Sequence, residues 1–403
     1  MKYCVVILDG AAGWPLPELG GRTCLGAAET PNLDELARSG RCGLAQTVPA
    51  HMEPSSSAAC TSILGYDPVE DYVGRGAIEA ASMGIQLAPD EVALRMNLVT
   101  VEDDRMRSYA AGHMPTEESR AIVADLGQAL DDETFRVHPG VAYRHILVVK
   151  GHPELADAEY TPPHDISDRE IAGNLPRGAG ADMLLEYMKR ARQVLQHSAL
   201  NLCRTDAGEL PVTDVWPFWP GVAPSGMIPF QSRRGKRAAL TSGVDLLNGL
   251  AVLTGIDRLD IDGVSDGPDN DYAAQVAGAI EALGNHDVVL VHVESPDEAG
   301  HAGDIRAKIA AIEAIDREVI GRLMACGIEM RLLAMPDHPT PIALKTHVGE
   351  AVPFVLWGPG VPSNGANAYS ESAAGNTGLF LDPGRGVMDL LLAQQPSRTA
   401  TVL

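Results

Sequence analysis

Short uninterrupted apolar runs recur along the chain, separated by stretches whose apolar residues are spaced three and four apart. The short runs predict buried strands, at Tyr3–Leu8, Ile146–Val149, Asp287–Val293, Met330–Ala334 and Val352–Leu356. Such runs, alternating with helices, are typical of a parallel sheet covered by helices on both faces. The first run ends at a charged residue, Asp9, so it predicts a buried strand and not a signal peptide.

The three- and four-residue spacing predicts amphipathic helices between these strands. They lie at Thr30–Ser39, Glu118–Leu130, Asp182–Gln196, Tyr272–Leu283 and Ile305–Cys326. No apolar run approaches the ~18–20 residues that a membrane-spanning helix needs, so we expect no membrane segment.

The middle of the chain has a different pattern. Residues 96–224 contain frequent prolines and the aromatic cluster Trp216-Pro-Phe-Trp219. We therefore expect residues 1–95 and 225–403 to form a doubly wound α/β domain, and residues 96–224 to form an inserted, smaller α/β domain.

Composition narrows the possible partners. The 403 residues include 31 Lys+Arg and 54 Asp+Glu, a formal charge of −23, and 45% are hydrophobic. This balance excludes wholesale disorder and argues against nucleic-acid or anionic-membrane surfaces, which need clustered Lys and Arg. An anionic substrate would need local basic residues or bound cations. Oligomeric state stays open.

Cysteine usage indicates the cellular compartment. The six cysteines are scattered along the chain, and no two of them form a CxxC pair. This pattern is typical of a reducing environment, so we expect a cytoplasmic protein.

Asp and His residues gather just after the predicted strands. Asp9 follows the first strand, and Asp297 and His301 are four residues apart after the third, a spacing that places both on one face of a helix. Asp337 and His338 stand between two prolines after the fourth strand, and His347 is nine residues further on. Each element alone also fits a helix cap, a rigid turn or a solvated pair.

Together these residues offer three carboxylates and three imidazoles. Mixed oxygen and nitrogen donors of this number suit two divalent cations such as Mn²⁺ or Zn²⁺. A candidate nucleophile lies in Ser55-Ser56-Ser57, which opens a predicted helix running to Ile63. A serine hydroxyl beside a cation loses its proton more easily and becomes a nucleophile. The serines also fit a simple helix-capping cluster.

Several motifs match a known family in order along nearly the whole chain. They are Val-Ile-Leu-Asp9-Gly10, Glu29-Thr-Pro-Asn-Leu-Asp34, Ser62-Ile-Leu-Gly-Tyr-Asp67-Pro, Gly74-Arg75-Gly-Ala-Ile-Glu79-Ala, Asn97-Leu-Val-Thr, Ala111-Gly-His113, Tyr143-Arg144-His145, Pro162-Pro-His164-Asp165, Asp297-Glu-Ala-Gly-His301, Asp337-His338 through Lys345-Thr-His347, and Tyr369-Ser-Glu371. With these motifs the sequence resembles the cofactor-independent phosphoglycerate mutases, archaeal-type branch, of the alkaline phosphatase superfamily.

The resemblance implies an alkaline phosphatase-like domain with two metal ions and an inserted domain that clasps the substrate. It assigns Asp297, His301 and His347 to one metal, and Asp9, Ser56, Asp337 and His338 to the other. Ser56 would take the phosphoryl group of 3-phosphoglycerate as phosphoserine and return it to the 2-hydroxyl of glycerate. The candidates for binding the small phosphorylated substrate are Arg75, His113, Arg144, His164 and Arg204.

The sequence departs from the family pattern near the nucleophile. Ser55-Ser56-Ser57 stands for Gly-Ser-Asp, Cys60 for an expected Asn, Ala274-Gln275 for Gly-Lys, and Val264-Ser-Asp-Gly267 for Gly-Ala-Thr-Gly. Alignment favours Ser56, while Ser55 and Ser57 stay open. The alternative functions are a metal-dependent phosphatase or phosphotransferase acting on another small ester or hydroxy acceptor, and a non-catalytic metal-stabilised binding protein.

Overall fold

The computed structural model describes residues 1–224 and 227–393 of the chain. The chain divides into two compact units: unit 1 comprises Met1–Tyr72 and Met227–Leu403, and unit 2 comprises Val73–Gly226. The sequence predicted that the inserted domain begins at residue 96, whereas unit 2 begins at Val73. No domain boundary lies near residue 95, because Glu91–Glu102 is one continuous strand, β3, that pairs along its length inside unit 2.

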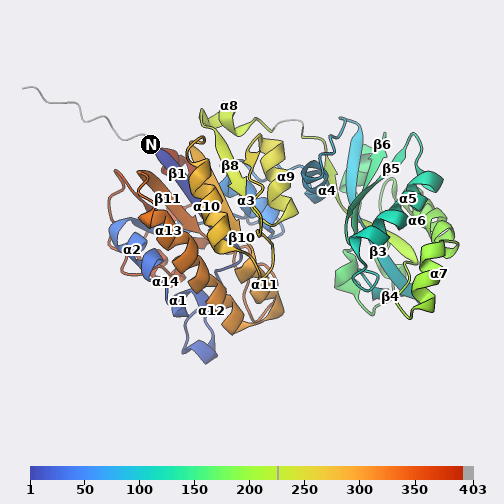
Figure 1. Cartoon of the computed structure of the whole chain (residues 1–403), viewed down its shortest axis with the longest axis horizontal. Coiled ribbons are helices and arrows are strands. Elements are labelled where there is room, and N and C mark those ends of the chain that lie inside the picture. Colours follow the sequence, from blue (N-terminus) through green and yellow to red (C-terminus); the bar gives the residue numbers. More distant parts are fainter. Residues whose placement is uncertain (225–226, 394–403) are drawn as a thin grey trace, which may run out of the picture. The chain divides into compact units, whose positions relative to one another are not determined.

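Unit 1 is built on an eight-stranded sheet with the order β13-β2-β12-β11-β1-β10-β8-β9. Figure 1 labels four of its central strands, β11, β1, β10 and β8. The strands are β1 (Lys2–Leu8), β2 (Arg41–Ala45), β8 (Ala238–Thr241), β9 (Asp257–Arg258), β10 (Val288–Val293), β11 (Met330–Met335), β12 (Val352–Trp357) and β13 (Phe380–Leu381). The strands from β11 to β9 run parallel. The predicted parallel direction of the Val352 strand is wrong: β12 is antiparallel to β11 and β2, because no crossover helix separates it from β11.

Helices cover both faces of this sheet. They are α1 (Cys24–Ala27), α2 (Pro31–Ser39), α3 (Ser56–Ile63), α8 (Phe230–Arg234), α9 (Asp245–Thr254), α10 (Tyr272–Ala282), α11 (Ser295–Ala302), α12 (Ile305–Ala314), α13 (Gly321–Ala325), α14 (Glu371–Asn376) and α15 (Gly386–Leu392). Apolar residues of α2, α10 and α12 pack on the face that carries Cys4, Val6 and Leu8. The group α3, α9 and α15 packs together and against β8 and β11. The predicted helix Ile305–Cys326 forms, with a π-helical turn at Ile315–Ile320 between α12 and α13.

Unit 2 has its own antiparallel sheet, in which β3 pairs with β4, β6 and β7, and β6 pairs with β5. Its other elements are β4 (Arg105–Ser108), β5 (Phe135–Val141), β6 (Arg144–Lys150), β7 (Asp214–Val222), α4 (Arg75–Ser82), α5 (Thr116–Leu130), α6 (Ala181–Gln196) and α7 (Ala199–Asp206). The run Ile146–Val149 is therefore a strand as predicted, but an antiparallel one in the smaller unit.

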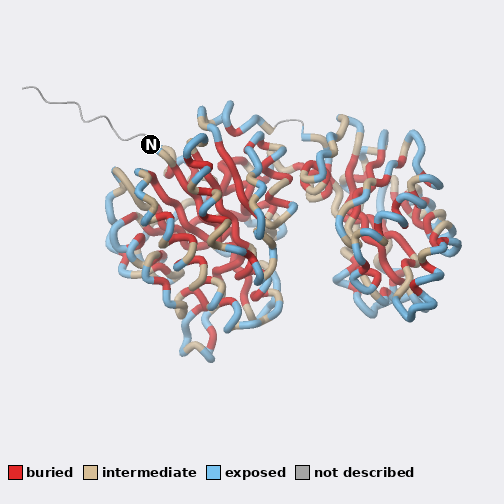
Figure 2. The backbone as a smooth tube through the Cα atoms, in the orientation of Figure 1, coloured by how far each residue is buried: buried red, intermediate tan, exposed pale blue. Residues whose placement is uncertain are grey.

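Burial follows the apolar runs of the sequence. Figure 2 shows buried backbone along the strands of each unit and exposed backbone at the outer turns. The predicted α/β fold is confirmed, and the structure has two sheets. Within the described ranges, none of the helices combines the length and apolar character needed to cross a membrane.

Candidate active site

Three neighbouring strands of unit 1 end at the same edge of the sheet. β1 lies between β10 and β11, parallel to both. Asp9 follows β1, α11 with Asp297 and His301 follows β10, and Asp337 with His338 follows β11. The carboxyl ends of parallel strands form the usual position for a site in such sheets. The fold thus brings together all the residues that the sequence proposed as metal ligands.

The first cluster, here called the Asp297 group, consists of Asp297, His301 and His347. Asp297 Oδ2 lies 3.0 Å from His301 Nε2 and 3.5 Å from His347 Nε2. The two Nε2 atoms are themselves 2.9 Å apart. The predicted one-turn spacing of Asp297 and His301 on α11 is confirmed.

Charge in the Asp297 group favours a cation. Burial alone would raise the pKa of Asp297, but hydrogen bonds from His301 and His347 hold it well below its ordinary value. The same hydrogen bond, which Asp297 accepts, raises the pKa of His301 to about 9. The carboxylate therefore stabilises positive charge at the point where the three side chains meet.

The second cluster, the Asp9 group, consists of Asp9, Asp337 and His338, all fully buried. His338 Nε2 lies 3.2 Å from Asp337 Oδ2 and 3.6 Å from Asp9 Oδ1. The backbone N–H groups of Gly10 and His338 donate to Asp337 Oδ1 at 3.1 and 2.7 Å. These bonds leave Oδ2 of Asp337 directed at His338.

The Asp9 group, and a second set in which His338 stands with Asp297 and His347, bring their ligand atoms close enough together for a cation. In each of the sets Asp9–Asp337–His338 and Asp297–His338–His347, one ligand atom per residue lies within 4.8 Å of the others. Asp9 Oδ1 is buried and has no hydrogen-bond partner among the described residues. Burial and the charges of Asp337 and Asp297 raise the pKa of Asp9 well above its ordinary value. Borderline metal ions bind mixed sets of carboxylate and imidazole ligands. The closely spaced carboxylates, the unpaired oxygen of Asp9 and the neighbouring imidazoles form such a set.

The hydrogen bonds around the imidazoles orient the ring nitrogens. His301 Nδ1 lies 3.0 Å from the carbonyl oxygen of Lys345, which only accepts, so Nδ1 carries a proton and Nε2 is the nitrogen that faces Asp297 and His347. Thr340 Oγ1 donates to Asp297 Oδ1 and lies 3.3 Å from His338 Nδ1. Because its single proton goes to the carboxylate, Thr340 accepts from His338 Nδ1, and His338 Nε2 keeps its lone pair.

The three adjacent serines have different surroundings in the structure. Ser55 is the N-cap of α3, with Oγ accepting from the N–H of Ala58. Ser57 is buried, and its hydroxyl lies 3.2 Å from that of Tyr72. Ser56 alone of the three is turned to the Asp9 group, with Oγ 3.1 Å from His338 Nε2.

Sequence reasoning assigned no role to His292 and Glu294, which also border Asp9. His292 Nε2 lies 2.7 Å from Asp9 Oδ2, and its Nδ1 lies 2.9 Å from Ser242 Oγ. Glu294 Oε2 is buried without a hydrogen-bond partner among the described residues. Their position, at the end of the strand that precedes Asp297, was the available signal.

Two departures from the family pattern have a structural role. Gln275 is completely buried, and its Nε2 donates to the carbonyl oxygen of His292 at 2.9 Å. It therefore holds the end of β10 in place and is not presented to an anion. Cys60 is also buried, with Sγ 3.8 Å from Asp337 Oδ2. Burial is the main cause that raises the pKa of the Cys60 thiol well above its ordinary value, and the nearby carboxylates raise it further.

A basic cluster forms in unit 2 around one carboxylate. Arg75 Nε and Arg95 Nη1 donate to Glu79 Oε1 at 2.8 and 3.0 Å. Burial lowers the pKa of Arg95, and the charges of Arg75 and Arg144 lower it further. Three guanidinium groups thus share a neighbourhood with Glu79, which gives a locally positive region in an acidic protein. Sequence reasoning proposed Arg75 and Arg144 but missed the buried Arg95.

The two predicted histidines of unit 2 both lie near one tyrosine. The ring centroid of Tyr109 is 6.0 Å from that of His113 and 6.2 Å from that of His164. His164 also contacts Trp219, at 5.5 Å between centroids, and Trp219 carries the guanidinium of Arg75 on its face. Arg75, His164 and His113 therefore belong to one contiguous group of side chains.

Arg204 differs from the other predicted substrate residues, and its assignment is corrected. Its side chain is 4% exposed and forms ion pairs with Glu118 and Glu209. The remaining N–H groups donate to the carbonyl oxygens of Leu210 and Ala111. Its Nε, Nη1 and Nη2 atoms all contact acceptors of the protein, and α7 packs beside α5. Arg204 thus supports the Ala111–His113 turn and is not presented to a ligand.

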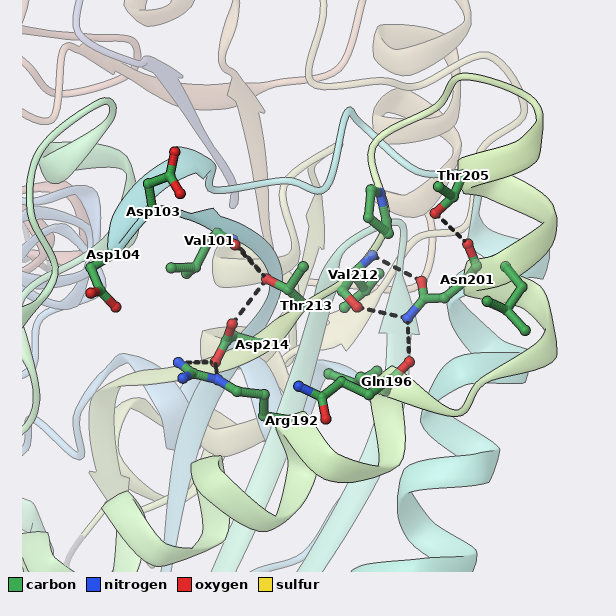
Figure 3. A pocket seen from close by; sticks show the side chains of 13 residues that line it. Val101, Asp103, Asp104, Arg192, Gln196, Asn201, Thr205, Val212, Thr213 and Asp214 are labelled. Atoms are coloured by element: carbon green, nitrogen blue, oxygen red, sulfur yellow. Dashed lines mark hydrogen bonds and ion pairs between the residues drawn. The ribbon is translucent and has the colours of Figure 1, made fainter.

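A cavity of about 450 Å³ lies elsewhere in unit 2, between the end of β3 and α7 (Figure 3). Asp103 and Asp104 stand at its rim, and its Arg192 is paired with Asp214 at 2.7 Å. None of the residues proposed for substrate binding lines it. An acidic rim and a neutralised arginine do not suit an anionic ligand.

Comparison with known proteins identifies the family of the chain. The family model described as 2,3-bisphosphoglycerate-independent phosphoglycerate mutase matches residues 37–201. A protein of that name from Methanothrix thermoacetophila is 44% identical over 98% of this chain and 100% of its own length. One from Geobacter sulfurreducens, named a probable enzyme of this kind, is 41% identical over 97% of this chain and 100% of its own length.

Solved structures show the same fold over the whole chain. A protein from Pyrococcus horikoshii superimposes with a TM-score of 0.82 at 26% identity, covering 98% of each chain. The cofactor-independent phosphoglycerate mutase from Thermoplasma acidophilum has a TM-score of 0.66 at 27% identity, covering 97% of this chain and 99% of its own. The chain belongs to the family of 2,3-bisphosphoglycerate-independent phosphoglycerate mutases.

Proposed function

We propose that this chain interconverts 3-phosphoglycerate and 2-phosphoglycerate through a phosphoserine intermediate at Ser56. The observation that carries the proposal is the Ser56 hydroxyl, 3.1 Å from His338 Nε2, at the sheet edge where the Asp9 and Asp297 groups converge. The names of the relatives support the same reaction.

The chemistry follows from a hydroxyl placed against a lone pair. Ser56 Oγ attacks the phosphorus of 3-phosphoglycerate, the bond from phosphorus to the C3 oxygen breaks, and the serine proton ends on that oxygen. The 2-hydroxyl of the retained glycerate then attacks the phosphorus of phosphoserine, and the Ser56 hydroxyl is restored. Positioning and charge stabilisation dominate such transfers, and exclusion of water separates a mutase from a phosphatase.

The proposed metal ligands are Asp297, His301 and His347 for one ion, and Asp9, Ser56, Asp337 and His338 for the other. We propose Mn²⁺ or Zn²⁺, because both accept mixed carboxylate and imidazole donors. When bound, divalent cations neutralise phosphoryl oxygens and lower the pKa of a coordinated hydroxyl. The orphaned Asp9 Oδ1 supports this assignment, as do the Nε2 atoms of His301 and His338, each of which faces an Asp carboxylate.

Unit 2 is proposed to hold the substrate's anionic groups through Arg75, Arg144, His113 and His164, and to retain glycerate between the two transfers. The cluster of guanidinium groups around Glu79 supports this part of the proposal. The same cluster would supply the local positive charge that an anionic substrate needs on a chain whose formal charge is −23. The reaction is proposed to occur in the cytoplasm, and six free thiols support a reducing environment.

An enolase-coupled assay with 3-phosphoglycerate and Mn²⁺ tests the proposal. We expect 2-phosphoglycerate to form without release of inorganic phosphate. Release of free phosphate with no 2-phosphoglycerate would refute the mutase and favour the phosphatase alternative.

The nucleophile is tested separately. A phosphorylated peptide trapped by acid quench should carry the phosphate on Ser56, and Ser56→Ala should abolish turnover while Mn²⁺ still binds. Ser55→Ala is the matched control, because Ser55 caps α3 and does not contact His338. Phosphate on Ser55 or Ser57 would overturn the assignment.

A further inference from the structure

Trp219 is the extra residue of a β-bulge in β7. On the neighbouring strand Leu94 pairs with Pro220 and Arg95 pairs with Phe218, so Trp219 has no partner in the register. Its φ is +48°, a left-handed conformation that is exceptional for a bulky side chain. Bulges re-aim side chains, and strained backbone of this kind persists where the surroundings enforce it, often at functional sites.

The bulge places the indole under the guanidinium of Arg75. Arg75 Cζ lies 3.9 Å from the indole centroid. A Cβ on the next residue, Gly76, would lie only 2.6 Å from the carbonyl oxygen of Trp219 and 2.2 Å from that of Ala93. Glycine at this position therefore allows the first turn of α4, which carries Arg75, to approach the bulge closely.

The guanidinium of Arg75 is held at one edge and on one face. Its Nε donates to Glu79, and its face rests on Trp219. Neither Nη atom has a hydrogen-bond partner in the part of the chain that the structure describes, and the side chain is 32% exposed. The Nη edge is thus presented as a pair of parallel donors, the arrangement that binds two oxygens of one carboxylate or phosphate.

We propose that Trp219 is a positioning residue that holds Arg75 ready to bind an anionic group of the substrate with both Nη atoms. The proposal rests on the proposed function only for the choice of 3-phosphoglycerate as the substrate. Arg95 and His164 contact the same indole, at 5.3 and 5.5 Å, so Trp219 joins Arg75 to the other cationic or titratable groups without adding charge. Without the ring, Glu79 on the same helix is the remaining side chain, among the described residues, that restrains Arg75.

The test compares Trp219→Leu, which removes the π face, with Trp219→Phe, which keeps one. We expect Trp219→Leu to raise the KM for 3-phosphoglycerate about tenfold, equivalent to about 1.4 kcal/mol, with a smaller effect on kcat. Trp219→Phe should restore most of the lost affinity. Trp216→Phe is the control, because Trp216 lies on the same strand but its Nε1 donates to the carbonyl oxygen of Thr161; it should leave KM within about twofold of the wild type.

A double-mutant cycle with Arg75→Met separates positioning from a general effect on folding. If Trp219 acts through Arg75, Trp219→Leu should raise KM less than about twofold in the Arg75→Met background. Calorimetric binding of 3-phosphoglycerate to the Ser56→Ala chain gives the same comparison without turnover, so it stays informative if the proposed reaction fails. Equal effects of Trp219→Leu in both backgrounds, or an unchanged affinity in Trp219→Leu, would overturn the proposal.

Discussion

Adding a single methyl group at Gly10 should displace a ligand of the candidate metal site. Its φ is +58°, and a Cβ added there would lie 2.2 Å from Asp297 Oδ1 and 2.7 Å from both Asp297 Cβ and Thr340 Oγ1. Ordinary contact begins near 3.4 Å, so the Asp297 carboxylate would have to retreat by about 1.2 Å. That carboxylate is the centre of the Asp297 group.

The cost of Gly10→Ala has two parts. Overpacking a buried site of this kind costs about 1–3 kcal/mol, and placing a non-glycine residue in the left-handed region costs about 1 kcal/mol more. We therefore expect the free energy of unfolding to fall by about 2–4 kcal/mol. We also expect Mn²⁺ affinity to fall at least about tenfold, because even loss of groups that merely orient a ligand has that effect.

Gly20→Ala isolates the backbone contribution. Gly20 has a similar φ of +65°, but nothing lies within 4 Å of the position of its Cβ. In this control variant the free energy of unfolding should fall by about 1 kcal/mol, and the affinity for Mn²⁺ should equal that of the wild type. The measurements are urea unfolding of the metal-free protein and isothermal titration with Mn²⁺. Equal losses of stability in the two variants, together with wild-type Mn²⁺ affinity in Gly10→Ala, would refute the reasoning.

Three further predictions concern the metal groups and the smaller unit. Thr340→Val removes the hydroxyl that orients Asp297 and His338, so Mn²⁺ affinity measured by titration should fall about 10–100-fold, and Thr340→Ser should recover most of it; equal affinities in both variants would contradict this role. Removal of metal with a chelator should abolish mutase turnover and leave the far-ultraviolet circular dichroism of the sheets unchanged, since the apolar cores are built without the ligands; undiminished turnover after verified metal removal would exclude a metal mechanism. Burial, followed by the charge of Arg95, lowers the pKa of His145 from 6.5 to about 3, so on acidification the unfolded chain takes up this proton first. Its contribution to stability is complete above about pH 6.5 and is lost towards pH 3, at up to about 1.4 kcal/mol per pH unit. The free energy of opening, measured by hydrogen exchange of the β5 and β6 amides, should fall with pH at that slope. In His145→Asn the slope should be smaller by the amount that uptake of about one proton contributes. Identical slopes in the two proteins would contradict the assignment.

Much of the site could be predicted from local sequence pattern. The short apolar runs before Asp9 and Asp337 marked strand ends, and the four-residue interval between Asp297 and His301 placed both side chains on one face of a helix. These features depend on periodicity over a few residues, which the sequence displays directly. The rule that sites form at the carboxyl ends of parallel strands then predicted that these residues belong to one site.

Other features depended on contacts between residues far apart in the chain. The contact that makes Ser56 the candidate nucleophile, rather than Ser55 or Ser57, is with His338, 282 residues away. Arg204 and Arg75 are both arginines on helices, yet one is enclosed by Glu118 and backbone carbonyls and the other presents its Nη edge.

The sequence by itself therefore determined which chemical groups the protein has and which strand and helix ends carry them. Tertiary structure alone decided that Val352–Trp357 runs antiparallel, that β3 belongs wholly to the smaller unit, and that a bulge aims Trp219 at Arg75. The physical reason is that strand direction, register and burial are set by pairing and packing between distant segments, whose free energy no local pattern encodes.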